Sequence, residues 1–406
     1  MKVLFIAGAC PYPPDSGGTV RTYNLLKRLS ARQEITLVAP EKPGVDLRNA
    51  FDGALANVIT VPAPRRTAAR TVRSLISPLP YIVQAHSNPA MNAAVRSALA
   101  SGGFDLVHCD SISVAPAVPR GASISKVFNA HNVEAVIWER YLANQRRPWM
   151  IPIIRSQLAK VARFESTLPS LFDCCVTVSE EDRDQMRRRY GASDVVVVPN
   201  GVDLDYYTPL ADPNEPTLAF VGSLDWRPNQ DAVRRLAESI WPRIRSDRPD
   251  ARLSIVGRRP PGWMRRLCRE PGVSLHADVP DIRPHLAAAA LIVVPLRIGG
   301  GSRLKILEAM AAGRCVVSTT IGAEGLDARD GEHLVIADDP ARFAQQCVSL
   351  LDDPARRQVI SRSGRALVET HYGWDKATSS LEQAWARSTA ALGLLTSDFG
   401  LRGCLP

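Results

Sequence analysis

Short runs of branched apolar residues alternate with helical patterns along the whole chain, which is typical of parallel sheets covered by helices. The runs predicted as strands in the first half span residues 2–9, 34–40, 57–64, 104–110, 125–130, 174–179 and 195–201. Those in the second half span residues 216–222, 251–257, 273–279, 291–296 and 315–319. We therefore expect an α/β protein with two doubly wound, Rossmann-like units rather than one large sheet.

Residues 200–216 form the best candidate for a linker between the two units, because turn formers and acids dominate them. Ligands of such sheets bind beyond the carboxyl ends of the strands, and a cleft between two such units is a natural site. Residues that directly follow predicted strands are therefore expected to line it. They are Gly17, Gly18, His108, His131, Gly222, Gly257 and Gly299–Gly301.

The most informative segment reads GGGSRLKILEAMAAG and runs from Gly299 to Gly313. It follows the predicted strand at 291–296 and predicts a glycine loop leading into a helix. The helix is expected to begin at a Ser302 cap, to end at Gly313, and to bury a stripe formed by Leu304, Leu307 and Ala311. A strand, a glycine loop and a helix N-terminus together favour an anion site.

Lys305 and Glu308 lie on a different face of this predicted helix, where the lysine can neutralise a phosphate and the glutamate can accept hydrogen bonds from a ribose diol. The alternative is an ordinary surface pair, which stabilises a helix by only about 0.2–0.5 kcal/mol. Hydrogen bonds to a charged ligand contribute roughly 1.5–3 kcal/mol each. Lys305 is the only lysine between Asp203 and Tyr372 in an arginine-rich chain, which favours the nucleotide-diphosphate interpretation.

Length and composition are those of a cytoplasmic globular enzyme with two sizeable cores, at 406 residues and 45% hydrophobic content. The first apolar run ends quickly in a proline-rich turn, so a secretory signal is not expected. The eight cysteines lack zinc-site spacing. Two close aspartate pairs, Asp182/Asp184 and Asp203/Asp205, are of a kind that arises by chance in a chain of this length, and we expect no metal site.

The net charge of +9 indicates acidic partners, with nucleotide phosphates and anionic lipid as candidates. Aromatic residues are not interleaved with the arginines, so no nucleic-acid binding is expected. Two basic helical patterns in the first half also carry apolar residues. One contains Arg66, Arg70, Arg73, Val72, Leu75 and Ile76, and the other follows Trp149-Met150-Ile151 and contains Arg155 and Arg163. They fit either peripheral contact with the inner face of a membrane or a solvated basic face.

Neither half carries a GxGxxG or a Walker-type motif, which weakens dinucleotide and P-loop interpretations. Other motifs occur in order along nearly the whole chain, from PYPPDSGGTVRTYNLL at 11–26 to HYGWDKATSSLEQ at 371–383. Between them lie VPNGVDLDYYTP, AFVGSL, LSIVG, the glycine-lysine-glutamate segment and GAEGL. With these motifs the chain resembles the retaining glycosyltransferases of family 4, which have the GT-B fold.

The resemblance implies two Rossmann-like domains that face each other across a cleft. The acceptor-side domain would span 1–203, the nucleotide-sugar domain 204–370, a helix crossing back to the first domain 371–390, and a tail 391–406. It implies sugar transfer from a nucleotide diphosphate sugar to a glycan or lipid-linked acceptor in surface polysaccharide or glycoconjugate synthesis. Retention at the anomeric carbon and independence of metals and cofactors are implied as well.

The resemblance also assigns residues. Glu308 matches the family's ribose-binding glutamate, and His131 matches a histidine that faces the donor sugar, although a buried structural histidine is the other interpretation. Gly17 and Gly18 match a loop that lets acceptor and diphosphate approach, or form a plain turn. The remaining donor-side expectations are Gly222, Arg227, Gly299, Gly300, Gly301, Ser302, Arg303 and Lys305, and the acceptor-side ones are Arg21 and His108.

Two departures from the family pattern stand out. Gly300 occupies the position of the first of two glutamates, so contacts to the sugar would come from the backbone amides of Gly301 and Ser302 or from other residues. Ser223 occupies the position of a usual arginine, so we expect Lys305, with Arg227 or Arg303, to bind the diphosphate. Three functional classes stay open: a transferase, an epimerase or hydrolase acting on the nucleotide sugar, and a noncatalytic binding subunit.

Overall fold

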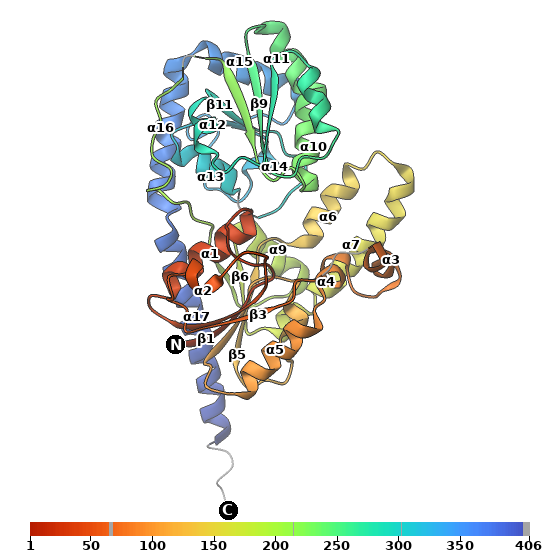
Figure 1. Ribbon diagram of the computed structural model, residues 1–406, viewed down its shortest axis with the longest axis vertical. Coiled ribbons are helices and arrows are strands. Elements are labelled where there is room, and N and C mark those ends of the chain that lie inside the picture. Colours follow the sequence, from red (N-terminus) through yellow and green to blue (C-terminus); the bar gives the residue numbers. More distant parts are fainter. Residues whose placement is uncertain (65–67, 214, 302, 401–406) are drawn as a thin grey trace, which may run out of the picture. The chain divides into compact units, whose positions relative to one another are not determined.

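The computed structural model describes residues 1–64, 68–213, 215–301 and 303–400, and the chain divides into two compact units (Figure 1). Unit 1 comprises residues 1–199 together with the chain from 377 onward, and unit 2 comprises residues 200–376. Each unit is built on its own parallel sheet. The predicted pair of doubly wound α/β units is therefore confirmed.

The sheet of unit 1 has the strand order β3-β2-β1-β4-β5-β6-β7, with all neighbouring pairs parallel. Its strands are β1 Lys2–Ile6, β2 Glu34–Pro40, β3 Asn57–Val61, β4 Leu106–Cys109, β5 Ser125–Ala130, β6 Cys174–Thr177 and β7 Val195–Val197. The order reverses between β1 and β4, which makes the carboxyl ends of these two strands the topological switch point.

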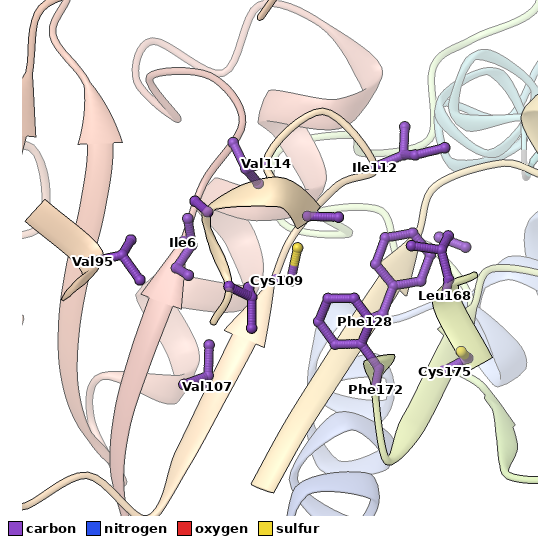
Figure 2. Close-up of a cluster of buried hydrophobic side chains, with 14 of the residues drawn as sticks. Ile6, Val95, Val107, Cys109, Ile112, Val114, Phe128, Leu168, Phe172 and Cys175 are labelled. Atoms are coloured by element: carbon purple, nitrogen blue, oxygen red, sulfur yellow. The ribbon is translucent and has the colours of Figure 1, made fainter. Parts of the chain in front are cut away.

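Apolar side chains on one face of this sheet form a continuous core with the helices that cover it (Figure 2). Phe128 on β5 packs against Phe172 with ring centroids 5.3 Å apart, and Val107 and Cys175 extend the same cluster along neighbouring strands. The central strands are buried and mostly apolar because helices cover both faces of a parallel sheet. This is why their sequences read as largely hydrophobic runs.

The helices of unit 1 connect these strands and carry several caps that the sequence supplies. Asn88 accepts two backbone hydrogen bonds at the start of α5, and Ser179 caps α9, which ends at Gly191 in the left-handed conformation. The helices are α1 Gly17–Leu29, α2 Leu47–Ala50, α3 Ala68–Ile76, α4 Tyr81–His86, α5 Pro89–Ala100, α6 Glu134–Ala143, α7 Ile151–Glu165, α8 Leu168–Leu171 and α9 Glu180–Tyr190, with short 3-10 turns η1 Ala115–Ala117 and η2 Pro148–Met150.

The sheet of unit 2 has the parallel strand order β10-β9-β8-β11-β12-β13, so its switch point lies between β8 and β11. The strands are β8 Thr217–Val221, β9 Arg252–Gly257, β10 Val273–Ala277, β11 Leu291–Val294, β12 Cys315–Ser318 and β13 Val335–Ile336. The helices are α10 Arg227–Arg235, α11 Trp241–Asp247, α12 Arg283–Ala287, α13 Leu304–Ala311, α14 Thr320–Ala323, α15 Pro340–Asp352 and α16 Pro354–His371, with η3 Leu236–Ile240 and η4 Met264–Arg269.

The last helix, α17, runs from Trp374 to Gly400 and begins in unit 2, while most of it belongs to unit 1. Trp385 is fully buried in unit 1, where its indole Nε1 donates a hydrogen bond to Nδ1 of His108 at 3.1 Å. Ser388 bonds Ser125 at 2.6 Å on the same side. Among the described residues, no helix has the length and apolarity needed to cross a membrane.

Candidate functional site

The switch point of unit 2 places two glycine-containing turns side by side. Gly222 follows β8, and the Gly299–Gly301 loop follows the neighbouring strand β11. A Cβ added at Gly222 would lie 2.8 Å from Nζ of Lys305 and 2.8 Å from Nδ2 of Asn229. The absence of a side chain at Gly222 therefore makes room for Lys305. Glycine at position 257 is explained by packing alone, since a Cβ there would lie 1.8 Å from the Gly222 carbonyl oxygen.

Lys305 lies near the start of α13 and bridges to the first of these turns. Its Nζ donates to Oδ1 of Asn229 at 2.7 Å and lies 4.5 Å from the centroid of the Phe220 ring. Burial, with a smaller contribution from the nearby Arg303 charge, lowers the pKa of Lys305 to about 7. Few groups nearby therefore offset the positive charge of the ammonium group, and a bound anion would stabilise its charged form.

Glu308 lies one turn further along α13, on the same face as Lys305. These two are the only partly exposed residues of the helix, because the other six are buried on every side. The predicted separate face of Lys305 and Glu308 is confirmed, but the buried surface of the helix is wider than the predicted stripe of Leu304, Leu307 and Ala311. The Tyr207 hydroxyl donates a hydrogen bond to the Glu308 carboxylate, yet burial still raises the pKa of Glu308 to about 7.

The glycine loop is held by a buried arginine. Arg303 is the N-cap residue of α13 and is only 4% exposed, with its guanidinium bonded to the Gly300 carbonyl and, at 2.8 Å, to the Ile321 carbonyl. Gly301 has a φ of +67°, and Gly299 one of +153°, so both require glycine. Ser302 lies outside the described residues. At the other end, Gly313 has a φ of +67° and ends the helix as predicted.

Ser223 and Arg227 both come shortly before Asn229, the residue that contacts Lys305. Arg227 begins α10 and its side chain is exposed, whereas Asn229, two residues later, is buried and reaches Lys305. The Ser223 hydroxyl accepts a hydrogen bond from Nε of Arg258 at 3.2 Å. An arginine from the next strand's end thus lies beside the position where the family pattern expects one.

In unit 1, the carboxyl ends of β4 and β5 carry a buried polar cluster centred on Asp110. Its Oδ2 accepts from the Thr22 hydroxyl at 2.6 Å, and its Oδ1 accepts from Nδ2 of Asn129 at 3.1 Å. Nε2 of His131 lies 3.5 Å from the same Oδ1. Burial opposes ionisation of Asp110, but these partners outweigh it and hold its pKa below the ordinary value.

His131 is the exposed end of this cluster, with 22% of its side chain accessible. It follows β5, as predicted, and Asp110 orients its imidazole. Arg21 and His108 are fully buried behind it, with Arg21 bonded to Asn129 at 3.3 Å. Burial lowers the pKa of His108 to about 4, so this imidazole is neutral. The expected acceptor-side position of Arg21 and His108 is therefore revised, because both support Asp110 from inside the unit.

Gly17 and Gly18 lie in the first turn of α1 rather than in a loop, with Ser16 as the N-cap residue. Both are exposed, and a Cβ added at Gly18 would meet no atom within 4 Å. Neither backbone conformation nor packing inside unit 1 therefore requires glycine at position 18. The turn leaves an uncovered helix N-terminus at the same end of the sheet as Asp110 and His131.

Several residues of these clusters were not among the sequence predictions, and three of them carry most of the contacts: Asp110, Asn229 and Tyr207. Asp110 ends a predicted strand, and a polar residue at a strand end could have been predicted as a site residue. Asn229 lies inside an ordinary helical pattern, and Tyr207 lies in the linker, so neither gave a signal. Among the described residues, no group of three or more His, Cys, Asp or Glu side chains is arranged to hold a metal ion.

Comparison with known proteins agrees with this architecture. Residues 16–206 match the family described as Glycosyltransferase Family 4, and residues 215–353 match Glycosyl transferases group 1. Together the two matches leave only the ends and a short segment near the linker uncovered. With the GT-B fold, they define the class of the protein: the chain is a glycosyltransferase of the family 4 type.

Several individual proteins are similar over most of their length. A phosphatidyl-myo-inositol mannosyltransferase of Mycobacterium leprae is 26% identical over 406 aligned positions, covering 93% of this chain and 95% of that protein. An uncharacterized 44.6 kDa protein in the cps region of Klebsiella pneumoniae is 22% identical and covers 94% and 98%.

Solved structures share the fold at low identity. Sucrose-phosphate synthase of Thermosynechococcus elongatus has a TM-score of 0.75 at 17% identity, covering 96% of this chain and all of that one. The HepE protein of Anabaena, solved in complex with UDP-glucose, has a TM-score of 0.66 at 14% identity, covering 95% of this chain and all of that one.

Proposed function

We propose that this glycosyltransferase moves a sugar from a nucleotide diphosphate sugar to a glycan or lipid-linked acceptor, with retention at the anomeric carbon and without a metal ion. The observation that carries the proposal is the pair of Lys305 and Glu308 on one face of α13, at the switch point of unit 2. Both groups are held in protonation states that a nucleotide diphosphate would change. Related proteins whose names state a mannosyl transfer or whose structures contain UDP-glucose support this ligand class.

Lys305 supplies positive charge to the leaving diphosphate, which is the charge that develops as the sugar–phosphate bond breaks. The Gly299–Gly301 loop lets the phosphates approach the backbone closely, and Arg303 keeps this loop in shape. Glu308, oriented by Tyr207, accepts hydrogen bonds from the ribose. The departing phosphate itself takes the acceptor's proton, so no protein nucleophile is needed.

His131 acts on the donor sugar in this proposal, and Asp110 fixes its orientation. Gly300, which stands where the family pattern has a glutamate, brings no side chain to the sugar, and its carbonyl is bonded to Arg303. Backbone amides of the loop therefore replace carboxylate contacts. The protein functions in the cytoplasm in glycan or glycolipid synthesis, with acceptors presented at the membrane.

The test measures release of nucleoside diphosphate from a panel of nucleotide sugars, with and without a host membrane extract. Wild type, Glu308→Ala and the exposed control Glu238→Ala are compared, each with and without a chelator. We expect release from one donor that depends on the extract, survives chelation, is lost in Glu308→Ala and is unchanged in Glu238→Ala. Release without the extract would establish a hydrolase or epimerase, and binding without release would establish a noncatalytic subunit.

A further inference from the structure

A cluster of exposed apolar side chains in unit 1 has no role in the proposed chemistry. Among the described residues, the three most exposed large hydrophobic side chains are Ile76 at 86%, Trp149 at 63% and Val72 at 62%. Leu75 and Ile153, at 47% and 37%, lie on the same two elements, α3 and the η2–α7 segment. We call these five residues the apolar patch.

Helix α3 exposes its apolar face, which is the reverse of an ordinary surface helix. Val72, Leu75 and Ile76 share one face by their spacing, and this face is exposed, whereas the polar residue Ser74 is 1% exposed. A surface helix normally buries its apolar stripe against the protein. The stripe is left exposed in unit 1, and an exposed apolar patch of this kind marks an interaction surface.

Helix α7 holds α3 in this orientation from the inside. Lys160 donates to the carbonyls of Ser74 at 3.0 Å and Leu75 at 2.8 Å, and Gln157 donates to the Ser74 carbonyl at 3.3 Å. These contacts satisfy the last carbonyls of α3 with a cation. Ile153 precedes Gln157 by one turn on the same face of α7, which brings the two halves of the patch next to each other. Figure 1 shows α3 beside α7.

The two chain segments that carry the patch contain charges of one sign only. The segments 53–104 and 140–164, which contain both halves, hold no aspartate or glutamate. Arg73, Arg147 and Arg155 are exposed next to the patch, and the Arg147 guanidinium lies 5.8 Å from the Trp149 ring. Arg66 lies outside the described residues, as does the side chain of Arg70. An apolar surface bordered by arginines, with a tryptophan between them, complements an anionic lipid interface.

We propose that the apolar patch, defined by α3 and the η2–α7 segment, docks onto the surface of an anionic lipid bilayer. Val72, Leu75 and Ile76 enter the boundary between headgroups and acyl chains, while Arg73, Arg147 and Arg155 contact the anionic headgroups. A second copy of this chain is a poor occupant because the patch would meet its own arginines without any acid. The proposal goes beyond sugar transfer, since lipid binding requires no turnover.

Co-sedimentation with vesicles of phosphatidylcholine, with and without about 30% phosphatidylglycerol, tests the proposal. We expect binding only to the anionic vesicles, at low salt. Val72→Ser/Ile76→Ser should weaken binding about a hundredfold or more, because each buried aliphatic side chain contributes about tenfold or more. Arg73→Gln/Arg147→Gln should weaken it by about 25-fold, from roughly fivefold for each arginine. Val359→Ser on α16, equally exposed at 56% but in unit 2, is the matched control and should bind as wild type.

Nucleotide-sugar binding by each variant shows that it is folded, and vesicle binding by Glu308→Gln separates the surface from catalysis. Equal binding to both vesicle types, or equal loss in Val359→Ser, would overturn the proposal. A concentration-dependent dimer that the Ile76 variant dissociates would instead assign the patch to self-association. Binding of a single-stranded oligonucleotide lost in the same variants would assign it to nucleic acid.

Discussion

Donor binding should change the protonation of unit 2, and the sign of this change should reverse near pH 7. Lys305 and Glu308 both have pKa values of about 7 in the free protein, for opposite reasons. A diphosphate next to Lys305 favours the ammonium form and raises its pKa. Ribose hydroxyls that donate to Glu308 favour the carboxylate and lower its pKa.

The magnitude follows from the two pKa values. If binding moves each by about two units, Lys305 takes up about 0.8 proton at pH 8, where the free protein holds it mostly neutral. At pH 6 Lys305 is already charged, and Glu308 releases about 0.8 proton instead. Two units correspond to about 2.7 kcal/mol at each group, close to the roughly 1.5–3 kcal/mol of a hydrogen bond to a charged group. With about 0.1 proton released by Glu308 at the same pH, the net uptake at pH 8 is about 0.7, so the dissociation constant should rise about fivefold per pH unit near pH 8.

Isothermal titration calorimetry with the donor nucleotide sugar, in buffers of different ionisation enthalpy, measures the proton count directly. A nucleotide sugar is the right ligand because its two phosphates do not titrate near pH 7, unlike those of a free nucleoside diphosphate. Lys305→Met should abolish uptake at pH 8, Glu308→Gln should abolish release at pH 6, and each should leave the other effect in place. Lys376→Met, which changes the other lysine of unit 2, is the control. A buffer response of the same sign at both pH values would refute the reasoning.

Four further substitutions separate structural roles from functional ones. Gly18→Ala should stabilise unit 1 by about 0.5–1 kcal/mol in thermal unfolding, because glycine is costly in a helix and a methyl group has room at this position. The same substitution should lower kcat/KM for the donor at least tenfold. Unchanged turnover would show that Gly18 only begins the helix. Tyr207→Phe should raise the donor KM about threefold to tenfold, since one hydrogen bond to Glu308 is lost, with kcat nearly unchanged. Asp110→Asn should lower kcat at least tenfold, because it removes the carboxylate that orients His131. Thr22→Val, which removes another partner of Asp110, should change mainly the free energy of unfolding.

Sequence patterns located the sheets because each central strand is a buried apolar run. All twelve predicted strands are present, and only β13 was missed, since its two residues make no recognisable run. The helix at Lys305 and its glycine end were also predictable, because helical spacing and a positive φ at Gly313 follow local rules. The Ser302 cap stays a prediction.

The polar clusters were less predictable because their partners lie far apart along the chain. Asp110 meets Thr22 across 88 positions, and Lys305 meets Asn229 across 76. Strand order brings such residues together, and no periodicity within one segment reports strand order. The same limit applies to His108, which follows the pattern of a site residue and is instead buried against Trp385 from α17.

Both halves of the proposed donor site follow one physical logic. Folding buries most of Lys305 and Glu308 with few hydrogen-bond partners, so the pKa of the lysine is lowered and that of the glutamate is raised. Such groups are preorganised, since the fold has removed part of their water and fixes their orientation through Asn229 and Tyr207 before a ligand arrives. A nucleotide diphosphate sugar restores the charge on both, and the same ammonium group then faces the charge that grows as the sugar leaves. An arginine at position 305 would hold its proton at any pH near neutrality and would lose this coupling between donor binding and protonation.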